Sequence, residues 1–168
     1  MHALYVLSVW AHILAAITWI GGIFFLVLVV VPWLRGQDRT TAAVFLRETG
    51  TRFRNVAWAC FAVSLATGVL NLWIRGVRPE NFAQREWLTS PFGHAVVCKL
   101  GLFALALVVS AIHDFIVGPR ATLAVEHGAL SPAAEKLRRQ ASMLGRANAL
   151  LALLLVALGV ILVRGWPL

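Results

Sequence analysis

The chain has 168 residues, of which 60% are hydrophobic and only 13% are charged, and its mean hydropathy is +0.82. This composition excludes an ordinary soluble domain, in which about 25% of the residues are charged. The formal net charge of +8 would suggest a nucleic-acid partner for a soluble protein. In a membrane protein, an excess of Lys and Arg instead marks the loops on the cytoplasmic side. We therefore expect the lipid bilayer, and no nucleic acid, as a partner of this chain.

Four apolar stretches are long enough to cross about 30 Å of hydrocarbon as helices, which takes roughly 20 residues. They cover about 4–34, 56–74, 93–117 and 147–163. Continuous apolar runs without alternation exclude a β-barrel. The short connections predict an all-α integral membrane protein with one domain, 1–168, folded as a four-transmembrane-helix bundle of up-down-up-down topology. No internal repeat is evident in the sequence.

The distribution of basic residues predicts the orientation of this bundle. Segments 35–55 and 118–146 carry five Lys and Arg residues each. The connections and ends on the opposite side carry four, namely Arg75, Arg78, Arg85 and Arg164. Because cytoplasmic loops are enriched in Lys and Arg, we expect a multi-pass protein of a bacterial-type inner (plasma) membrane with both termini outside.

The first connection contains signals for a separate short helix. Asp38 is a typical helix cap, and Gly50 is a typical helix stop. Residues 41–48 between them are amphipathic. The pattern predicts a short helix that lies at the inner membrane surface, before the second span begins.

The second half of the chain contains one predicted helix end and one predicted helix start. Gly118 and Pro119 predict the end of the third helix. Pro132 is suited to the first position of the next helix. No strong breaker follows before Val163, so we expect 132–146 to extend the fourth helix into the cytoplasm.

The third span carries ionisable residues that a membrane helix rarely tolerates, namely His94, Lys99, His113 and Asp114. Intramembrane ionisable groups are costly and are functional candidates by default. A buried Lys99 needs a partner or must lose its proton, unless its ammonium reaches the outer surface. Lys99 and His113 are 14 residues apart and share a helix face within about 40°, which suits a proton or ion path. His113 with Asp114 is either a second metal or proton site or a solvated helix end.

His12 in the first span and His94 in the third span form the leading candidate site. The first and third helices run in the same direction, and at about 1.5 Å of rise per residue His12 and Lys99 lie at similar depth. Two imidazoles from facing helices suit a haem iron or a transition metal in a bundle core. Arg78 and Arg85 would then receive the haem propionates. The alternative is that His12 hydrogen-bonds a neighbouring helix and that His94 is an interfacial residue.

Two helices carry a resemblance to a known family. The residues Phe92-Gly93-His94, Lys99-Leu100 and Leu102-Phe103 resemble the helix signature of the CopD-type copper-resistance membrane domain. The residues Arg52-Phe53-Arg54 and Ala66-Thr67-Gly68-Val69-Leu70 resemble the preceding helix of that domain. This resemblance implies a four-helix membrane protein that handles copper.

A second, more distant resemblance is to HemJ-type protoporphyrinogen oxidases, which are also small four-helix membrane proteins. In that family a histidine of helix one and a histidine-lysine pair that opens helix three accompany haem binding. Here His12, His94 and Lys99 fall in similar places. The resemblance implies a haem-dependent membrane oxidoreductase.

We therefore expect a CopD-like inner-membrane protein that handles copper or binds haem b, with His12, His94 and His113 as metal ligands and Lys99 tuning the charge of the site. One alternative is a haem-dependent oxidoreductase, HemJ-like or linked to a quinone or another redox partner, in which Lys99 is catalytic. Another is an accessory membrane subunit without a cofactor. Soft Cu(I) favours sulfur ligands, yet the methionines are only Met1 and Met143. A homodimer is left open.

Overall fold

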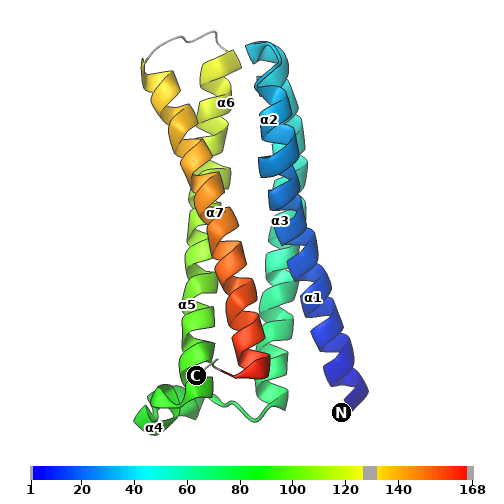
Figure 1. The fold of residues 1–168 in the computed structure, drawn as a ribbon, viewed down its shortest axis with the longest axis vertical. Coiled ribbons are helices and arrows are strands. Elements are labelled where there is room, and N and C mark those ends of the chain that lie inside the picture. Colours follow the sequence, from blue (N-terminus) through cyan, green and yellow to red (C-terminus); the bar gives the residue numbers. More distant parts are fainter. Residues whose placement is uncertain (1, 127–131, 166–168) are drawn as a thin grey trace.

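The computed structural model describes residues 2–126 and 132–165, and within these residues the regular secondary structure is helical throughout. Two long antiparallel helix pairs stand side by side (Figure 1). Four continuous helical segments are long and apolar enough to cross a membrane, namely His2–Leu34, Thr40–Ile74, Pro91–Ala124 and Pro132–Arg164. The predicted all-α bundle of four membrane-length helices is confirmed. Helices suit a bilayer because each satisfies its backbone hydrogen bonds within its own segment.

The first pair consists of one interrupted helix and one uninterrupted helix. Its elements are α1 (His2–Phe25), the π-helix η1 (Leu26–Val30), α2 (Val31–Leu34) and α3 (Arg39–Ile74). Asp38 caps α3, because the Thr41 backbone N–H donates to its Oδ1 at 2.9 Å. Hydrogen bonds from Thr41 hold the pKa of Asp38 below its ordinary value.

The prediction of a separate surface helix over 41–48 is wrong, because α3 continues through Gly50 and Val56 without a break. Gly50 has no heavy atom near the position that a Cβ would occupy, so no close approach depends on it. A glycine inside a helix costs only about 1 kcal/mol relative to alanine. That cost is too small to end a helix whose residues on both sides continue the hydrogen-bond pattern.

Two short helices, the 3₁₀ helix η2 (Pro79–Ala83) and α4 (Arg85–Thr89), join the second pair to the first. The second pair consists of one interrupted helix, made of α5 (Pro91–Ile112), the π-helix η3 (His113–Val117) and α6 (Gly118–Glu126), and one uninterrupted helix, α7 (Pro132–Arg164). α7 runs without interruption over the whole range that we assigned to the fourth span and its extension. α5 begins at Pro91 after the cap residue Ser90, whose Oγ accepts from the Gly93 N–H at 3.1 Å.

The prediction that Gly118 and Pro119 end the third helix is also wrong, because the chain continues through them as α6. The π-helix makes this continuation compatible with proline. The Gly118 N–H binds the His113 carbonyl, five residues back. Pro119 has no N–H to offer to the Asp114 carbonyl, and the guanidinium of Arg54 donates to that oxygen at 3.3 Å instead.

The start of α1 and the end of α7 lie at one end of the bundle together with α4, and the connection between α2 and α3 lies at the other end (Figure 1). We call these the terminal end and the far end. α1 packs mainly along α3 and α5 mainly along α7, while α6 contacts α3 and α7 and a smaller contact joins α1 to α7. This arrangement gives the predicted up-down-up-down topology.

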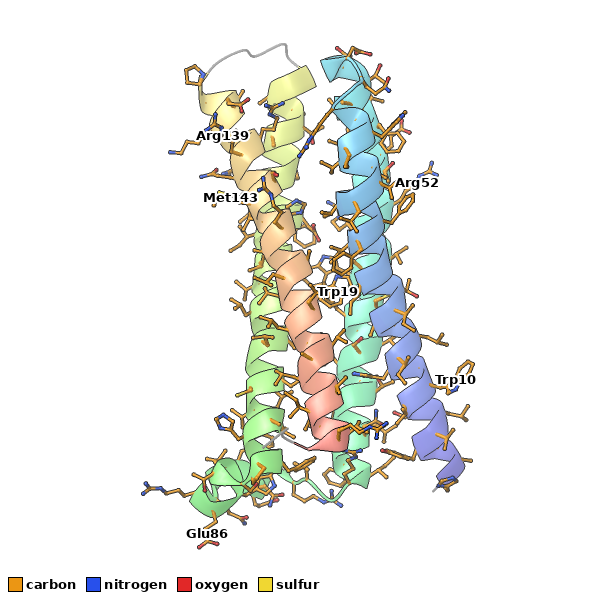
Figure 2. All side chains as sticks on the ribbon, viewed as in Figure 1. Trp10, Trp19, Arg52, Glu86, Arg139 and Met143 are labelled. Carbon is orange, nitrogen blue, oxygen red and sulfur yellow. The ribbon has the colours of Figure 1, made fainter. Side chains whose placement is uncertain are left out.

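Trp19 lies in the core between the two pairs, whereas Trp10 on the same helix points away from the bundle (Figure 2). The Trp19 ring packs on the Phe61 ring with centroids 4.8 Å apart. Trp10 is 64% exposed, and many other large apolar side chains also face outward. Such a surface would be unfavourable in water, so the outer faces of the helices contact lipid.

Candidate functional site

His12 points at α3 and hydrogen-bonds its polar face. Its Nδ1 lies 2.8 Å from Oγ1 of Thr67. One turn earlier on α1, the buried Ser8 hydroxyl donates to the Thr67 carbonyl at 3.4 Å. Gly68 lies beside the ring, since a Cβ at that position would be in ordinary van der Waals contact with Cε1 of His12, at 3.6 Å. The helix pair α1 and α3 therefore holds His12 in a defined orientation.

The hydrogen bonds of Thr67 favour a proton on Nδ1 of His12. The Thr67 hydroxyl donates to the Val63 carbonyl of its own helix at 2.6 Å. A hydroxyl has one proton to donate, so towards His12 its oxygen accepts, and Nδ1 of His12 is the donor. The neutral imidazole then keeps its free lone pair on Nε2. This tautomer can bind a metal ion or a proton through Nε2.

Lys99 comes from the other helix pair and acts electrostatically on His12. Its side chain is half-buried, and its Nζ lies 3.4 Å from the position that a Cβ of Gly159 on α7 would occupy. Arg75, at the end of α3, acts on Lys99 in turn, and its Nε donates to the Tyr5 hydroxyl at 3.3 Å. The terminal half of the bundle therefore contains one imidazole and two basic side chains.

A polar stripe on α3 accompanies these groups. Thr67, Asn71 and Arg75 are spaced four residues apart and lie on one helix face. Oδ1 of Asn71 is buried and has no hydrogen-bond partner among the described residues. A buried acceptor of this kind costs about 1–3 kcal/mol unless a donor reaches it. The site therefore has the capacity to accept a further hydrogen bond.

The sequence analysis singled out His12 and Lys99, which are both half-buried, but gave Thr67 and Asn71 no role in the site. Thr67 appears there only as one of the residues of the second helix that carry the family resemblance. The signal that could have found both is their four-residue spacing, which continues to Arg75. Within apolar helix α3, this spacing marks one polar face.

The structure does not bring His94 to His12. The inward side of α5 is marked by the buried residues Val96, Ala106 and Ser110, while His94 is exposed. Five residues along a helix correspond to a rotation of about 140°, so His94 and Lys99 lie on different faces of α5. The geometry favours Lys99 over His94 as the group of α5 that acts with His12.

The two arginines that we considered for haem propionates belong to the connection at the terminal end. The Arg78 guanidinium donates to the carbonyls of Trp73 and Val77 at 2.7 and 3.0 Å, and it lies 3.9 Å from the centre of the Trp73 ring. Arg78 is therefore already held by the loop. Arg85 is exposed at the start of α4.

His113 lies towards the far end and forms a separate polar cluster. Its Nδ1 is 2.9 Å from Oδ1 of Asp114, and the indole N–H of Trp58 donates to Oδ2 of Asp114 at 3.1 Å. The Arg54 guanidinium packs 5.4 Å from the centre of the Phe115 ring. Asp114 thus orients His113 and binds α3, so His113 is more than a solvated helix end.

Within residues 2–126 and 132–165, no group of three or more His, Cys, Asp and Glu residues is placed to hold a metal ion. Cys60 is buried and Cys98 is half-buried, and both are free thiols. Met143 is 64% exposed, and Met1 lies outside the described residues. This donor set does not fit a resident copper centre or a haem iron held by His12 and His94 together. It fits a weaker site with one imidazole.

Comparison with known proteins places the chain in a family. The profile of CopD, copper resistance protein D, matches residues 47–162, which is more than half of the chain. An uncharacterised protein of Aquifex aeolicus (strain VF5) is 29% identical over 155 residues, covering 92% of both chains. The copper transport protein CutJ of Bacillus subtilis (strain 168) is 34% identical over 102 residues, which cover 61% of this chain and 17% of that longer protein. No solved structure matches the chain significantly. The chain is thus a member of the CopD family of membrane proteins.

Proposed function

We propose that this protein handles copper as a cargo in a bacterial inner membrane, and that His12 is the residue that binds it. The CopD family and the similarity to a copper transport protein support the choice of copper. The observation that carries the assignment to His12 is its hydrogen bond to Thr67, which leaves Nε2 with a free lone pair. Groups that hold the other nitrogen of a ligand histidine raise its basicity and fix its ring.

A site with one imidazole and few sulfur atoms suits a metal in passage better than a resident one. Soft Cu(I) binds most tightly to thiolate and thioether ligands, whereas imidazole also binds copper. Cys60 is buried in the core and Met143 is exposed, so neither accompanies His12. Weak coordination is an advantage for a cargo that must leave again.

Lys99 controls the charge of this site. The ammonium of Lys99, which acts electrostatically on His12, opposes a copper cation by repulsion, and Arg75 adds to the positive charge. We propose that Lys99 releases its proton to water when copper binds, so that its neutral amine faces the metal. Metal affinity then rises with pH, because the ligands must be deprotonated. Because Lys99 releases one proton when copper binds, it couples copper binding to the release of a proton.

The test is copper retention by the detergent-purified protein, with an absorption spectrum recorded before and after reduction with dithionite. We compare the unaltered chain, His12→Ala and, as the matched control, His94→Ala. The expected result is copper on the unaltered chain and on His94→Ala, and loss of copper from a folded His12→Ala. Size-exclusion chromatography and circular dichroism report folding of each variant.

Each other outcome overturns a defined part of the proposal. Full copper occupancy in His12→Ala removes His12 from the ligand set. Loss of copper from both variants restores the pair of His12 and His94 as ligands. A Soret band that shifts on reduction favours the haem-dependent oxidoreductase. A protein with neither copper nor haem favours the accessory subunit without a cofactor.

A further inference from the structure

The two helix pairs share an unusual irregularity at equivalent positions. The π-helices η1 and η3 begin at Leu26 and His113, which are 87 residues apart. In each case a proline follows the start of the π-helix by six residues, and Pro32 and Pro119 are also 87 residues apart. π-helices are rare, and mostly appear as single-turn bulges in longer helices. Two such bulges at the same spacing from a proline point to a common origin or a common constraint.

Most buried positions of the first interrupted helix correspond to buried positions of the second one at the same offset of 87 residues. Four of the six buried residues of the first interrupted helix have buried counterparts 87 residues later: Ser8 with Ala95, Trp19 with Ala106, Ile23 with Ser110, and Leu34 with Ala121. The counterparts of the other two, Ala15 and Val30, are half-buried. The side chains differ in size and polarity, so the sequence alone does not align them. What the two helices share is which face is turned inward.

Buried positions of the uninterrupted helices α3 and α7 correspond at an offset of 91 residues. Buried Ala43, Cys60 and Phe61 correspond at this offset to buried Ala134, Leu151 and Ala152. The difference between the two offsets is four residues, which are inserted between Ala121 and Ala134 in the second pair. Each pair begins at the terminal end and returns to it (Figure 1). Repeats that run in the same direction are related by an axis along the membrane normal.

Residues of the candidate site are related to one another by the same two offsets. His12 and Lys99 are 87 residues apart, and the glycines next to them, Gly68 and Gly159, are 91 residues apart. A Cβ at Gly68 would lie 3.6 Å from His12, and a Cβ at Gly159 would lie 3.4 Å from Nζ of Lys99. In each pair, a polar side chain of the interrupted helix therefore packs on a glycine of the uninterrupted helix.

We infer that the bundle is a duplicated helix pair, and that Lys99 is the structural counterpart of His12. The site is then built from two equivalent arms, one on each helix pair, of which one ends in an imidazole and the other in an amine. This inference rests on the proposed function for the statement that copper binds there. It adds that both arms act on one copper ion, with Gly68 and Gly159 as equivalent positioning residues.

The experiment is an exchange of the two arms, using His12→Lys, Lys99→His and the double variant in the full chain. If the arms are equivalent, His12→Lys loses about tenfold or more in copper affinity because an amine replaces the imidazole, Lys99→His binds copper at least as tightly as the unaltered chain, and the double variant recovers to within a few fold of the unaltered chain. A double variant that binds no better than the weaker single variant overturns the equivalence of the arms.

Thermal stability supplies a readout that does not need copper. Lys99 acts electrostatically on position 12, so the ammonium introduced by His12→Lys is repelled by the ammonium of Lys99, and repulsion between like charges is destabilising. We expect the thermal unfolding midpoint of His12→Lys to fall by about 2–4 °C. The double variant again has one imidazole and one amine, so we expect its midpoint to return to that of the unaltered chain. If no copper binds to any variant but the stability recovers, the proposed function fails and the duplication stands. If stability does not recover in the double variant, the duplication of the site is wrong.

Discussion

The hydroxyl of Thr67 occupies a central place in the candidate site, because it both accepts from Nδ1 of His12 and donates to the Val63 carbonyl. These two bonds together determine the tautomer of the imidazole. Without the hydroxyl, the His12 ring would be free to rotate, and the proton would be free to move to Nε2. The binding nitrogen of His12 thus depends on a residue that never contacts the metal.

Replacing Thr67 by Val tests this dependence. Valine keeps the β-branched shape and removes only the hydroxyl. We expect copper affinity to fall about 10–100-fold, which is the usual effect of losing the partner of a ligand histidine, with the bundle still folded. Copper titration of the purified variant measures it. Thr51→Val is the matched control, because the Thr51 hydroxyl is exposed and only bonds the Arg47 carbonyl of its own helix. Equal affinity of both variants would show that Thr67 does not hold the ligand.

The residues of the site could be predicted from the sequence only in part. His12 and Lys99 stood out because ionisable groups in apolar spans are rare. The pairing with His94 was favoured by residue type, but the rotation of α5 turns His94 outward. Rotation of a membrane helix is hard to predict from an apolar sequence, because its lipid face and its packed face have similar hydrophobicity. For the same reason, Thr67 was not assigned to the site.

At the scale of the helices, the errors of prediction concern where helices end. Glycine and proline were interpreted as stops at Gly50 and Gly118-Pro119, and both helices continue. In lipid, an interrupted helix leaves backbone groups without water to bind. Continuation is therefore favoured wherever a local change satisfies these groups, as the π-helix η3 and the Arg54 side chain do at Pro119.

The start of α5 depends on a glycine for a steric reason. A Cβ at Gly93 would collide with the backbone carbonyl of Trp87, in the short helix α4. Because a backbone atom cannot move aside as a flexible side chain can, we expect Gly93→Ala to destabilise the protein by about 2 kcal/mol and to lower the unfolding midpoint by about 4–8 °C. Gly101→Ala on the same helix is the control, since nothing lies near its Cβ position. A midpoint of Gly93→Ala equal to that of Gly101→Ala would contradict the collision.

At the scale of the whole molecule, the sequence was sufficient for the class of fold. Apolar segments of the right length have few alternatives to a helix in a bilayer, and short connections make neighbours antiparallel. The duplication was not visible in the same sequence. Counterparts such as Trp19 and Ala106 share burial but not size, so the symmetry lies in the packing and in the π-helices rather than in residue identity.

The orientation of the bundle stays a prediction, and it decides on which side the candidate site opens. The basic connection at the far end predicts that this end is cytoplasmic and that His12 and Lys99 lie nearer the outer surface. Single cysteines test it, Glu80→Cys at the terminal end and Gln37→Cys at the far end, in a chain with Cys60→Ala and Cys98→Ala. Both positions are exposed. A membrane-impermeant maleimide added to intact cells should label Glu80→Cys at once and Gln37→Cys only after permeabilisation. The reverse pattern would make the site open to the cytoplasm, and copper would then enter it from inside the cell.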